Sequence, residues 1–105
     1  MDIKIHPTAI IDKNTKLLGK NIIIGPYAVI GPKVVIKSGC YIHSHCVIEG
    51  DTTLGENNQI FPFCTIGLSP QHAKFSGGKS KLIVGNNNII REHVTMHPGT
   101  DIGTK

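Results

Sequence analysis

The chain has 105 residues, of which 39% are hydrophobic and 5% aromatic, with no Trp and a formal net charge of +4. This length fits one domain, residues 1–105, near the low end of ordinary domain size. No apolar run approaches the ~20 residues of a membrane span, and the N-terminus lacks the charged-then-apolar layout of a signal peptide. We therefore expect no membrane span and a cytoplasmic protein.

A six-residue spacing of aliphatic residues begins near the N-terminus. Ile5 and Ile11 are in step, but Leu18 follows Ile11 by seven positions. The sequence therefore predicts one extra residue around Lys16–Leu17, as a small bulge at a corner. His6, beside Pro7, is expected to cap the first repeat.

From Leu18 the spacing of six is kept to Ile66, and it resumes in the same phase from Val84 to Ile102. A period of six matches neither a helix nor simple strand alternation, and it has room for one short strand and a tight turn. Three such units would close a triangular coil of 18 residues, with neighbouring coils paired ~4.8 Å apart. The pattern predicts an all-β repeat fold of about five coils, with a core that exists only by stacking. The in-phase residues are Leu18, Ile24, Ile30, Ile36, Ile42, Ile48, Leu54, Ile60, Ile66, Val84, Ile90, Met96 and Ile102.

The three cysteines share one position of the repeat. Cys40, Cys46 and Cys64 each stand four residues after an in-phase residue, where Ala28 and Val34 stand elsewhere. Cysteines in such a ladder behave as small apolar side chains. We expect packed, reduced thiols, in line with a cytosolic protein.

A segment without hexads, residues 68–83, interrupts the repeat. Loops of this length inside a compact domain are usually functional. No Asp or Glu occurs from Asn57 to Ile90, and the basic residues there and just after are Lys74, Lys79, Lys81 and Arg91. These few charges, without interleaved aromatic residues, favour a phosphorylated small molecule or an acidic carrier protein over nucleic acid.

Four sequence segments together resemble a known enzyme family. They are Ile-His-Pro-Thr-Ala-Ile at 5–10, Ile-Gly-Pro-Tyr at 24–27, Pro-Gln-x-x-Lys-Phe at 70–75 and Ile-Arg-Glu-x-Val-Thr-x-His-x-Gly-Thr at 90–100. The chain resembles, over essentially its whole length, the hexapeptide-repeat UDP-N-acetylglucosamine O-acyltransferases that begin lipid A synthesis. The resemblance implies a left-handed parallel β-helix and a homotrimer with active sites between subunits. It also implies transfer of a 3-hydroxyacyl chain from acyl carrier protein to the sugar 3-hydroxyl of UDP-N-acetylglucosamine, with no metal or other cofactor.

The resemblance also implies substrate-binding residues. Gln71 matches a loop glutamine beside the sugar site, Lys74 matches a substrate-contacting lysine, and His97 matches a histidine that lines the cleft. His72 departs from the family, which has an aspartate there, and an imidazole cannot replace a carboxylate as an acceptor for sugar hydroxyls. The family's general-base histidine and a C-terminal helical domain would lie beyond Lys105, so we expect an N-terminal piece whose own catalytic residue is unknown.

Two other functions are consistent with the sequence. A short chain with cleft residues but no general base could act as a non-catalytic β-helical scaffold. His43 and His45, or His93 and His97, could instead be zinc ligands, as in γ-class carbonic anhydrases, which are also left-handed β-helix trimers. No matching motif surrounds these histidines, and we expect His43 and His45 to be exposed or to lie at contacts between subunits.

Overall fold

A computed structural model of the chain describes residues 3–67, 82–96 and 101–102. Asp101 and Ile102 are described by their backbone alone. The described residues form short strands and turns. Among them is no helix long and apolar enough to cross a membrane.

The strands form three parallel five-stranded sheets. Sheet A contains β1 (Ile3–Ile5), β4 (Ile22–Ile24), β7 (Tyr41–Ile42), β10 (Gln59–Ile60) and β13 (Ile89–Ile90). Sheet B contains β2 (Ile10–Ile11), β5 (Val29–Ile30), β8 (Val47–Ile48), β11 (Thr65–Ile66) and β14 (Thr95–Met96). Sheet C contains β3 (Lys16–Leu18), β6 (Val34–Lys37), β9 (Thr52–Leu54), β12 (Leu82–Val84) and β15 (Asp101–Ile102).

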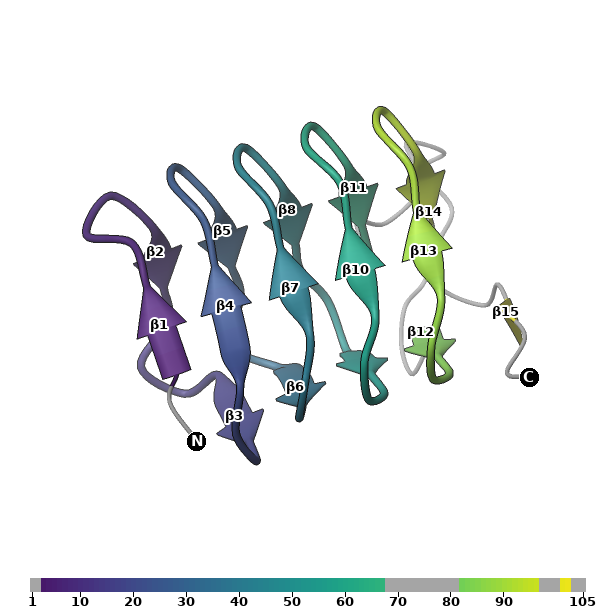
Figure 1. Ribbon diagram of the computed structural model, residues 1–105, viewed down its shortest axis with the longest axis horizontal. Coiled ribbons are helices and arrows are strands. Elements are labelled where there is room, and N and C mark those ends of the chain that lie inside the picture. Colours follow the sequence, from purple (N-terminus) through teal and green to yellow (C-terminus); the bar gives the residue numbers. More distant parts are fainter. Residues whose placement is uncertain (1–2, 68–81, 97–100, 103–105) are drawn as a thin grey trace, which may run out of the picture.

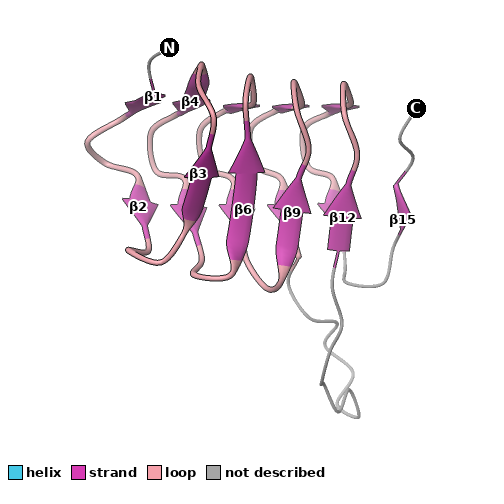
Figure 2. Ribbon diagram, turned by 90° about the horizontal axis from the view of Figure 1, so that it is seen from below, coloured by secondary structure: helices cyan, strands magenta, loops and turns pink. Residues whose placement is uncertain are grey.

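Consecutive strands belong to consecutive sheets, so three strands make one turn of a coil. In Figure 1 the chain rises through sheet A at the front, crosses to sheet B behind and returns through sheet C, while it advances from the N-terminus towards the C-terminus. This is a left-handed coil, opposite to the usual crossover rule. Figure 2 shows the sheet C strands of the five coils side by side. The predicted left-handed parallel β-helix of five coils is confirmed. The turns between sheets are called the A–B, B–C and C–A corners below.

From the second coil onwards, one aliphatic side chain of each strand's in-phase position fills the centre of the coil. These side chains are at most 4% exposed, and full burial of each contributes roughly 1.5–3 kcal/mol. Met96 packs partly buried against the same cluster. The fully described residues of this column are Ile24, Ile30, Ile36, Ile42, Ile48, Leu54, Ile60, Ile66, Val84 and Ile90.

The predicted phase is wrong at Leu18. Leu18 is 49% exposed, whereas Leu17 packs against the core. In the pairing of β3 with β6, Leu17 lies opposite Ile36 and Leu18 lies opposite Lys37. The extra residue therefore lies after Leu17, in the C–A corner, where Gly19 adopts φ 117°. The first coil accommodates it as a longer corner and not as a bulge around Lys16–Leu17.

The long segment interrupts the coil without changing its phase. Ile36 pairs with Leu54, 18 positions later, whereas Leu54 pairs with Val84, 30 positions later. The chain between Leu54 and Val84 thus contains 12 residues more than a normal coil. Since 12 is a multiple of six, the hexad spacing continues across the interruption.

The cysteines occupy the core, as predicted. Cys40, Cys46 and Cys64 are free thiols with at most 1% exposure. Each Sγ donates a hydrogen bond to a backbone carbonyl of the next coil: Cys40 to Gly55 (3.0 Å), Cys46 to Phe61 (3.1 Å) and Cys64 to Arg91 (2.8 Å). Burial raises the pKa of all three thiols, that of Cys46 to about 11. They are protonated packing groups and not reactive nucleophiles.

Candidate functional site

The B–C corner of the fourth coil is where the long segment leaves the β-helix. The described chain stops at Gly67, directly after β11, and resumes at Leu82, the first residue of β12. The backbone N–H of Gly67 donates to the Met96 carbonyl (2.8 Å), and that of Leu82 donates to the Asp51 carbonyl (3.0 Å). Both ends of the segment are thus attached to neighbouring coils.

The departure point is closely packed. A Cβ on Gly67, whose φ is 88°, would collide with the Glu49 carbonyl and the Thr52 hydroxyl. Thr52 is completely buried, and its hydroxyl donates to the Glu49 carbonyl (2.7 Å). A Cβ on Gly50 would lie 2.5 Å from the Gly67 carbonyl oxygen. Only glycine fits at position 67 without displacing these groups.

The four predicted substrate residues, Gln71, His72, Lys74 and His97, lie outside the described residues. The described residues that flank them nevertheless meet. Gly67 precedes the long segment, Met96 precedes His97, and the two are joined by the backbone hydrogen bond above. The fold therefore starts both stretches from adjacent coils at the B–C corner.

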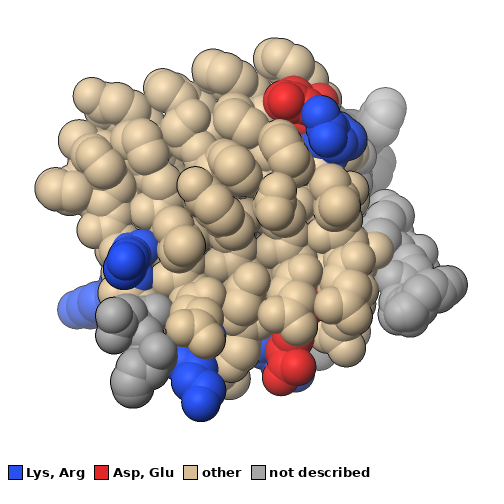
Figure 3. Space-filling model, in the orientation of Figure 1, with Lys and Arg blue, Asp and Glu red and all other residues tan. Residues whose placement is uncertain are grey.

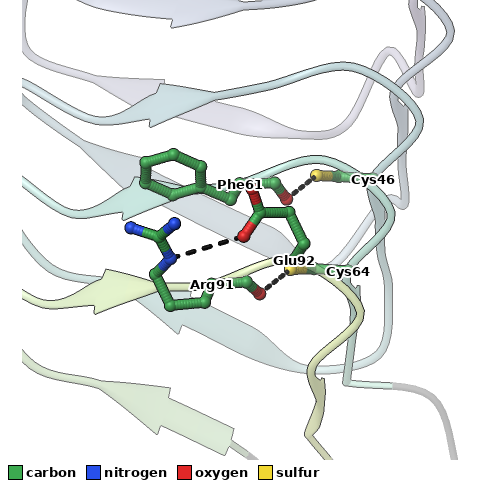
Figure 4. Close-up of polar contacts among 5 residues, drawn as sticks. All are labelled: Cys46, Phe61, Cys64, Arg91 and Glu92. Atoms are coloured by element: carbon green, nitrogen blue, oxygen red, sulfur yellow. Dashed lines mark hydrogen bonds and ion pairs between the residues drawn. The ribbon is translucent and has the colours of Figure 1, made fainter.

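Arg91 does not belong to this corner. It follows β13 at the A–B corner, and its guanidinium carbon lies 4.3 Å from the centroid of the Phe61 ring. Its Nε also lies 3.3 Å from Glu92 Oε1 (Figure 4). The pKa of Glu92 is lowered by a hydrogen bond from the backbone N–H of Glu92 itself and by the charge of Arg91. Arg91 was expected to share a positive region with the lysines of the long segment, but the described contacts of Arg91 lie at the A–B corner, along the opposite edge of sheet B.

The histidines of the middle coils lie in ring stacks at the A–B corner. The His43 ring lies between those of Tyr41 (4.1 Å between centroids) and Phe61 (4.8 Å). Its Nε2 is buried and has no hydrogen-bond partner. His6 caps the first A–B corner as predicted, with Nδ1 accepting from the Thr8 backbone N–H (3.1 Å).

A second stack runs along the outermost edge of the corner, and we call it the aromatic ridge: Tyr27, His45, Phe63 and His93. Adjacent ring centroids are 5.1, 4.9 and 5.5 Å apart. All four residues have φ between 56° and 64°. This left-handed conformation costs roughly 1–2 kcal/mol for a bulky side chain. The equivalent position of the C–A corner holds Asn21, Gly39, Asn57 and Asn87, residues that tolerate it better.

Sequence reasoning missed the aromatic ridge, although a signal was present. An aromatic or imidazole ring stands at the third position after the in-phase residue of sheet A in four successive coils. The zinc alternative gains no support from this arrangement. Within the ranges the structure describes, no three His, Cys, Asp or Glu side chains are grouped so as to hold a metal ion.

Comparison with known proteins places the chain among its relatives. Residues 17–50 match the family description "Bacterial transferase hexapeptide (six repeats)". An acyl-[acyl-carrier-protein]–UDP-N-acetylglucosamine O-acyltransferase of Rickettsia bellii is 48% identical over 99 residues, which cover 94% of this chain and 35% of the relative. Over nearly all of its length the chain is thus similar to UDP-N-acetylglucosamine O-acyltransferases. The enzyme of the same name from Bartonella bacilliformis is 51% identical over 98 residues, 93% of this chain and 35% of the relative.

Solved acyltransferase structures have the same fold. The enzyme LpxA of Acinetobacter baumannii superposes with a TM-score of 0.85 at 47% identity, covering 91% of this chain and 37% of that one. Another UDP-N-acetylglucosamine acyltransferase superposes with a TM-score of 0.87 at 40% identity, covering 92% of this chain and 37% of that one. The chain spans about a third of the length of the relatives it matches.

Proposed function

We propose that this chain supplies β-helical coils and part of the substrate cleft of a UDP-N-acetylglucosamine O-acyltransferase. That enzyme transfers a 3-hydroxyacyl group from acyl carrier protein to the sugar 3-hydroxyl, the first step of lipid A biosynthesis. The observation that carries the proposal is 48–51% identity over 93–94% of the chain to acyltransferases of this name. We further propose that the enzyme is a cytoplasmic homotrimer that needs no metal or other cofactor.

Within this chain the proposed roles are substrate contacts. The Lys74 ammonium suits a phosphate of UDP or a carbonyl of the acyl carrier's pantetheine arm. Gln71 and His97 are proposed to line the sugar end of the cleft. His72 can donate to a sugar hydroxyl when its ring is protonated or in the right tautomer, but it cannot offer the two acceptor oxygens of a carboxylate. The general base is proposed to lie in the part of the relatives that this chain does not span, as is a C-terminal helical domain.

The anchoring of the long segment supports this placement of the cleft. Gly67, Thr52 and Asp51 fix where the segment leaves and rejoins the β-helix. The hydrogen bond between Gly67 and Met96 brings the residue before His97 to the same corner. A rigid base under a substrate-binding loop is the usual arrangement for precise binding.

Titration calorimetry with UDP-N-acetylglucosamine tests the proposal. We expect Lys74→Ala to weaken binding about 10-fold or more, the loss of one charge-assisted hydrogen bond. Lys33→Ala, at an exposed lysine of the B–C corner two coils away, should bind like the unsubstituted chain. His72→Asp should bind more tightly, because it restores a carboxylate acceptor.

Two outcomes would contradict the proposal. Equal binding by the Lys74→Ala and Lys33→Ala variants would remove Lys74 from the site, and no detectable binding by any variant would leave the scaffold function. Acyl transfer by the purified 105-residue chain would instead overturn the placement of the general base outside it.

A further inference from the structure

Charged side chains are segregated along the axis of the β-helix. Within the described ranges, every lysine lies in the first two coils, whereas Glu49, Asp51, Glu56 and Glu92 lie in the third coil or beyond it. In Figure 3, which shows the sheet A side, basic side chains gather at the left, over the first coils. Five exposed lysines lie on the outer face of sheet C or on the two corners beside it, and we call this surface the basic face: Lys13, Lys16, Lys20, Lys33 and Lys37.

The pairing of β3 with β6 brings two of these lysines beside an exposed leucine. Leu17 packs against the core, so its neighbours Lys16 and Leu18 point outward from sheet C. Lys37 follows the buried Ile36 and lies opposite Leu18 in the register of the two strands. Leu18 is 49% exposed. The outer face of sheet C therefore presents an apolar side chain between ammonium groups.

A hollow of about 350 Å³ opens where the basic face meets the B–C corner. Its lining includes Lys16, Lys33 and Asn14, together with the apolar side chains of Pro32 and Val35. Two ammonium groups and one carboxamide can donate hydrogen bonds to the oxygens of a phosphate group. The lining holds no aromatic ring and no carboxylate, so it offers no platform for a base and no anionic acceptor for sugar hydroxyls. These groups suit the phosphate of a simple head group.

The charge of the basic face is not neutralised within the described chain. Among the residues that the structure describes, the ion pair joins Arg91 to Glu92, far from this surface. The carboxylate of Asp12, beside Lys13 in sequence, accepts a hydrogen bond from the Asn14 backbone N–H (2.8 Å). Five lysines and Asp12 give the surface a charge of +4, equal to the formal net charge of the whole chain. Such a surface attracts an anionic partner.

The composition of the basic face favours a lipid surface over a protein or a nucleic acid. All of its cations are lysines, whereas protein interfaces are enriched in Arg and depleted in Lys. It carries no aromatic side chain, so no base can stack on it. Lys20 and Lys33 lie at opposite edges of sheet C, beyond the reach of one free phosphate. A bilayer presents many phosphates in one plane and accepts an apolar side chain between its head groups.

We propose that the basic face binds the surface of a bilayer that contains anionic phospholipid. One lipid phosphate occupies the hollow between Lys16 and Lys33, and Leu18 lies among the head groups. Each lysine near such a surface strengthens binding about 5-fold. Repulsion of the acidic third coil tilts the β-helix, so that the first two coils lie nearest the bilayer. This is a peripheral and reversible contact, and it goes beyond the proposed acyl transfer.

Co-sedimentation of the 105-residue chain with vesicles tests the inference. We expect binding to vesicles of equal parts phosphatidylglycerol and phosphatidylcholine and none to phosphatidylcholine alone. Binding should weaken as added salt shortens the Debye length from about 30 Å to about 8 Å. Lys16→Glu should weaken it about 30-fold or more, because an attraction becomes a repulsion. The matched control is Lys4→Glu, at an exposed lysine of the same coil on sheet A, and it should weaken binding less than about 3-fold.

A tryptophan probe locates the contact. The chain contains no Trp, so Leu18→Trp and Ile83→Trp each place a single fluorophore on the outer face of sheet C. Ile83 is 54% exposed and lies in the fourth coil. On the anionic vesicles we expect the emission of Leu18→Trp to shift to shorter wavelength and that of Ile83→Trp to stay unchanged. Circular dichroism verifies that each variant is folded.

Several results would overturn the inference. They are no binding to the anionic vesicles, equal binding to neutral ones, equal weakening by Lys16→Glu and Lys4→Glu, or equal emission shifts of the two tryptophan variants. Binding of inorganic pyrophosphate without vesicle binding would assign the hollow to a free phosphorylated ligand. Binding of a single-stranded oligonucleotide or of acyl carrier protein, again without vesicle binding, would assign the face to that partner. None of these measurements involves UDP-N-acetylglucosamine, so failure here and failure of the proposed function are distinguishable.

Discussion

The Asn58 carboxamide joins two coils by accepting a hydrogen bond from the backbone N–H of Asn88 through Oδ1 (2.8 Å). Its Nδ2 donates to the Gly55 carbonyl of its own coil (3.1 Å) and to the Gly85 carbonyl of the next (2.7 Å). Asn58 is 1% exposed and holds the position that Ile22 and Cys40 hold in the second and third coils. One polar side chain therefore bonds three backbone groups at the C–A corner, and two of them, in Gly85 and Asn88, directly follow β12, where the β-helix has resumed after the long segment.

Removal of this side chain is expected to be costly. Asn58→Ala removes a partner from two carbonyls and one N–H and leaves the Gly55 carbonyl with the Cys40 thiol alone, and we expect a loss of about 3 kcal/mol in the free energy of unfolding. Asn58→Asp keeps the shape but cannot donate to the two carbonyls, so it should lose at least as much. Urea denaturation measures both, with exposed Asn14→Ala as a control that should change stability by less than about 0.5 kcal/mol. A small effect of Asn58→Ala would show that water replaces the amide.

The period of six could be read from the sequence because it is imposed by geometry. Every coil must place one side chain per strand inside, so the aliphatic column is compulsory and visible. The position of the extra residue in the first coil could not be read from the sequence, because Leu17 and Leu18 are both leucines. Only the pairing of Leu17 with Ile36 decides which of them points into the core. A spacing rule cannot distinguish two adjacent apolar residues when one of them begins a corner.

The candidate site was less predictable than the fold. The family resemblance identified Gln71, His72, Lys74 and His97 as candidate substrate-binding residues, and these residues lie outside the described structure. The aromatic ridge was missed for a physical reason. Its rings meet through contacts 18 or 30 positions apart and adopt backbone conformations that propensity assigns to Asn or Gly. Arg91 was assigned by charge alone, and its side chain is held by the Phe61 ring at another corner.

The corrected phase of the first coil leads to a direct test. Leu17→Ala should reduce the free energy of unfolding by about 2 kcal/mol, because Leu17 packs against the core. Leu18→Ala, at a side chain 49% exposed, should change it by less than about 0.5 kcal/mol. Thermal or urea unfolding of the two variants gives the comparison. The reverse order of effects would restore Leu18 to the core.

Gly67 is expected to be intolerant of substitution. Gly67→Ala introduces a Cβ against the Glu49 carbonyl and the Thr52 hydroxyl, at φ 88°. We expect a loss of at least about 2 kcal/mol from the clash and the strained backbone. Gly31→Ala is the matched control, since its nearest contact, Glu49 Cα, would be 3.4 Å from the new Cβ. Equal unfolding midpoints for the two variants would argue that the chain rearranges around position 67.

The buried thiols make stability depend on alkaline pH. Burial raises the pKa of Cys46 from 9.0 to about 11 and also raises those of Cys40 and Cys64. In the unfolded chain a thiol ionises near its ordinary pKa, while in the folded chain it stays protonated, so the unfolded state binds fewer protons between these values. The free energy of unfolding is therefore unaffected by these groups below about pH 8.5 and falls as the pH rises.

Urea titrations from pH 8 to pH 10.5 measure this fall. Each fully protected thiol contributes a slope approaching ~1.4 kcal/mol per pH unit. Lys and Tyr side chains titrate in the same range, so the informative quantity is the difference between the unsubstituted chain and Cys46→Ala. The variant should be less stable at pH 8, because it leaves a small cavity, but should lose stability more slowly as the pH rises. Parallel pH profiles would mean that the Cys46 thiol ionises as readily in the folded protein as in the unfolded chain.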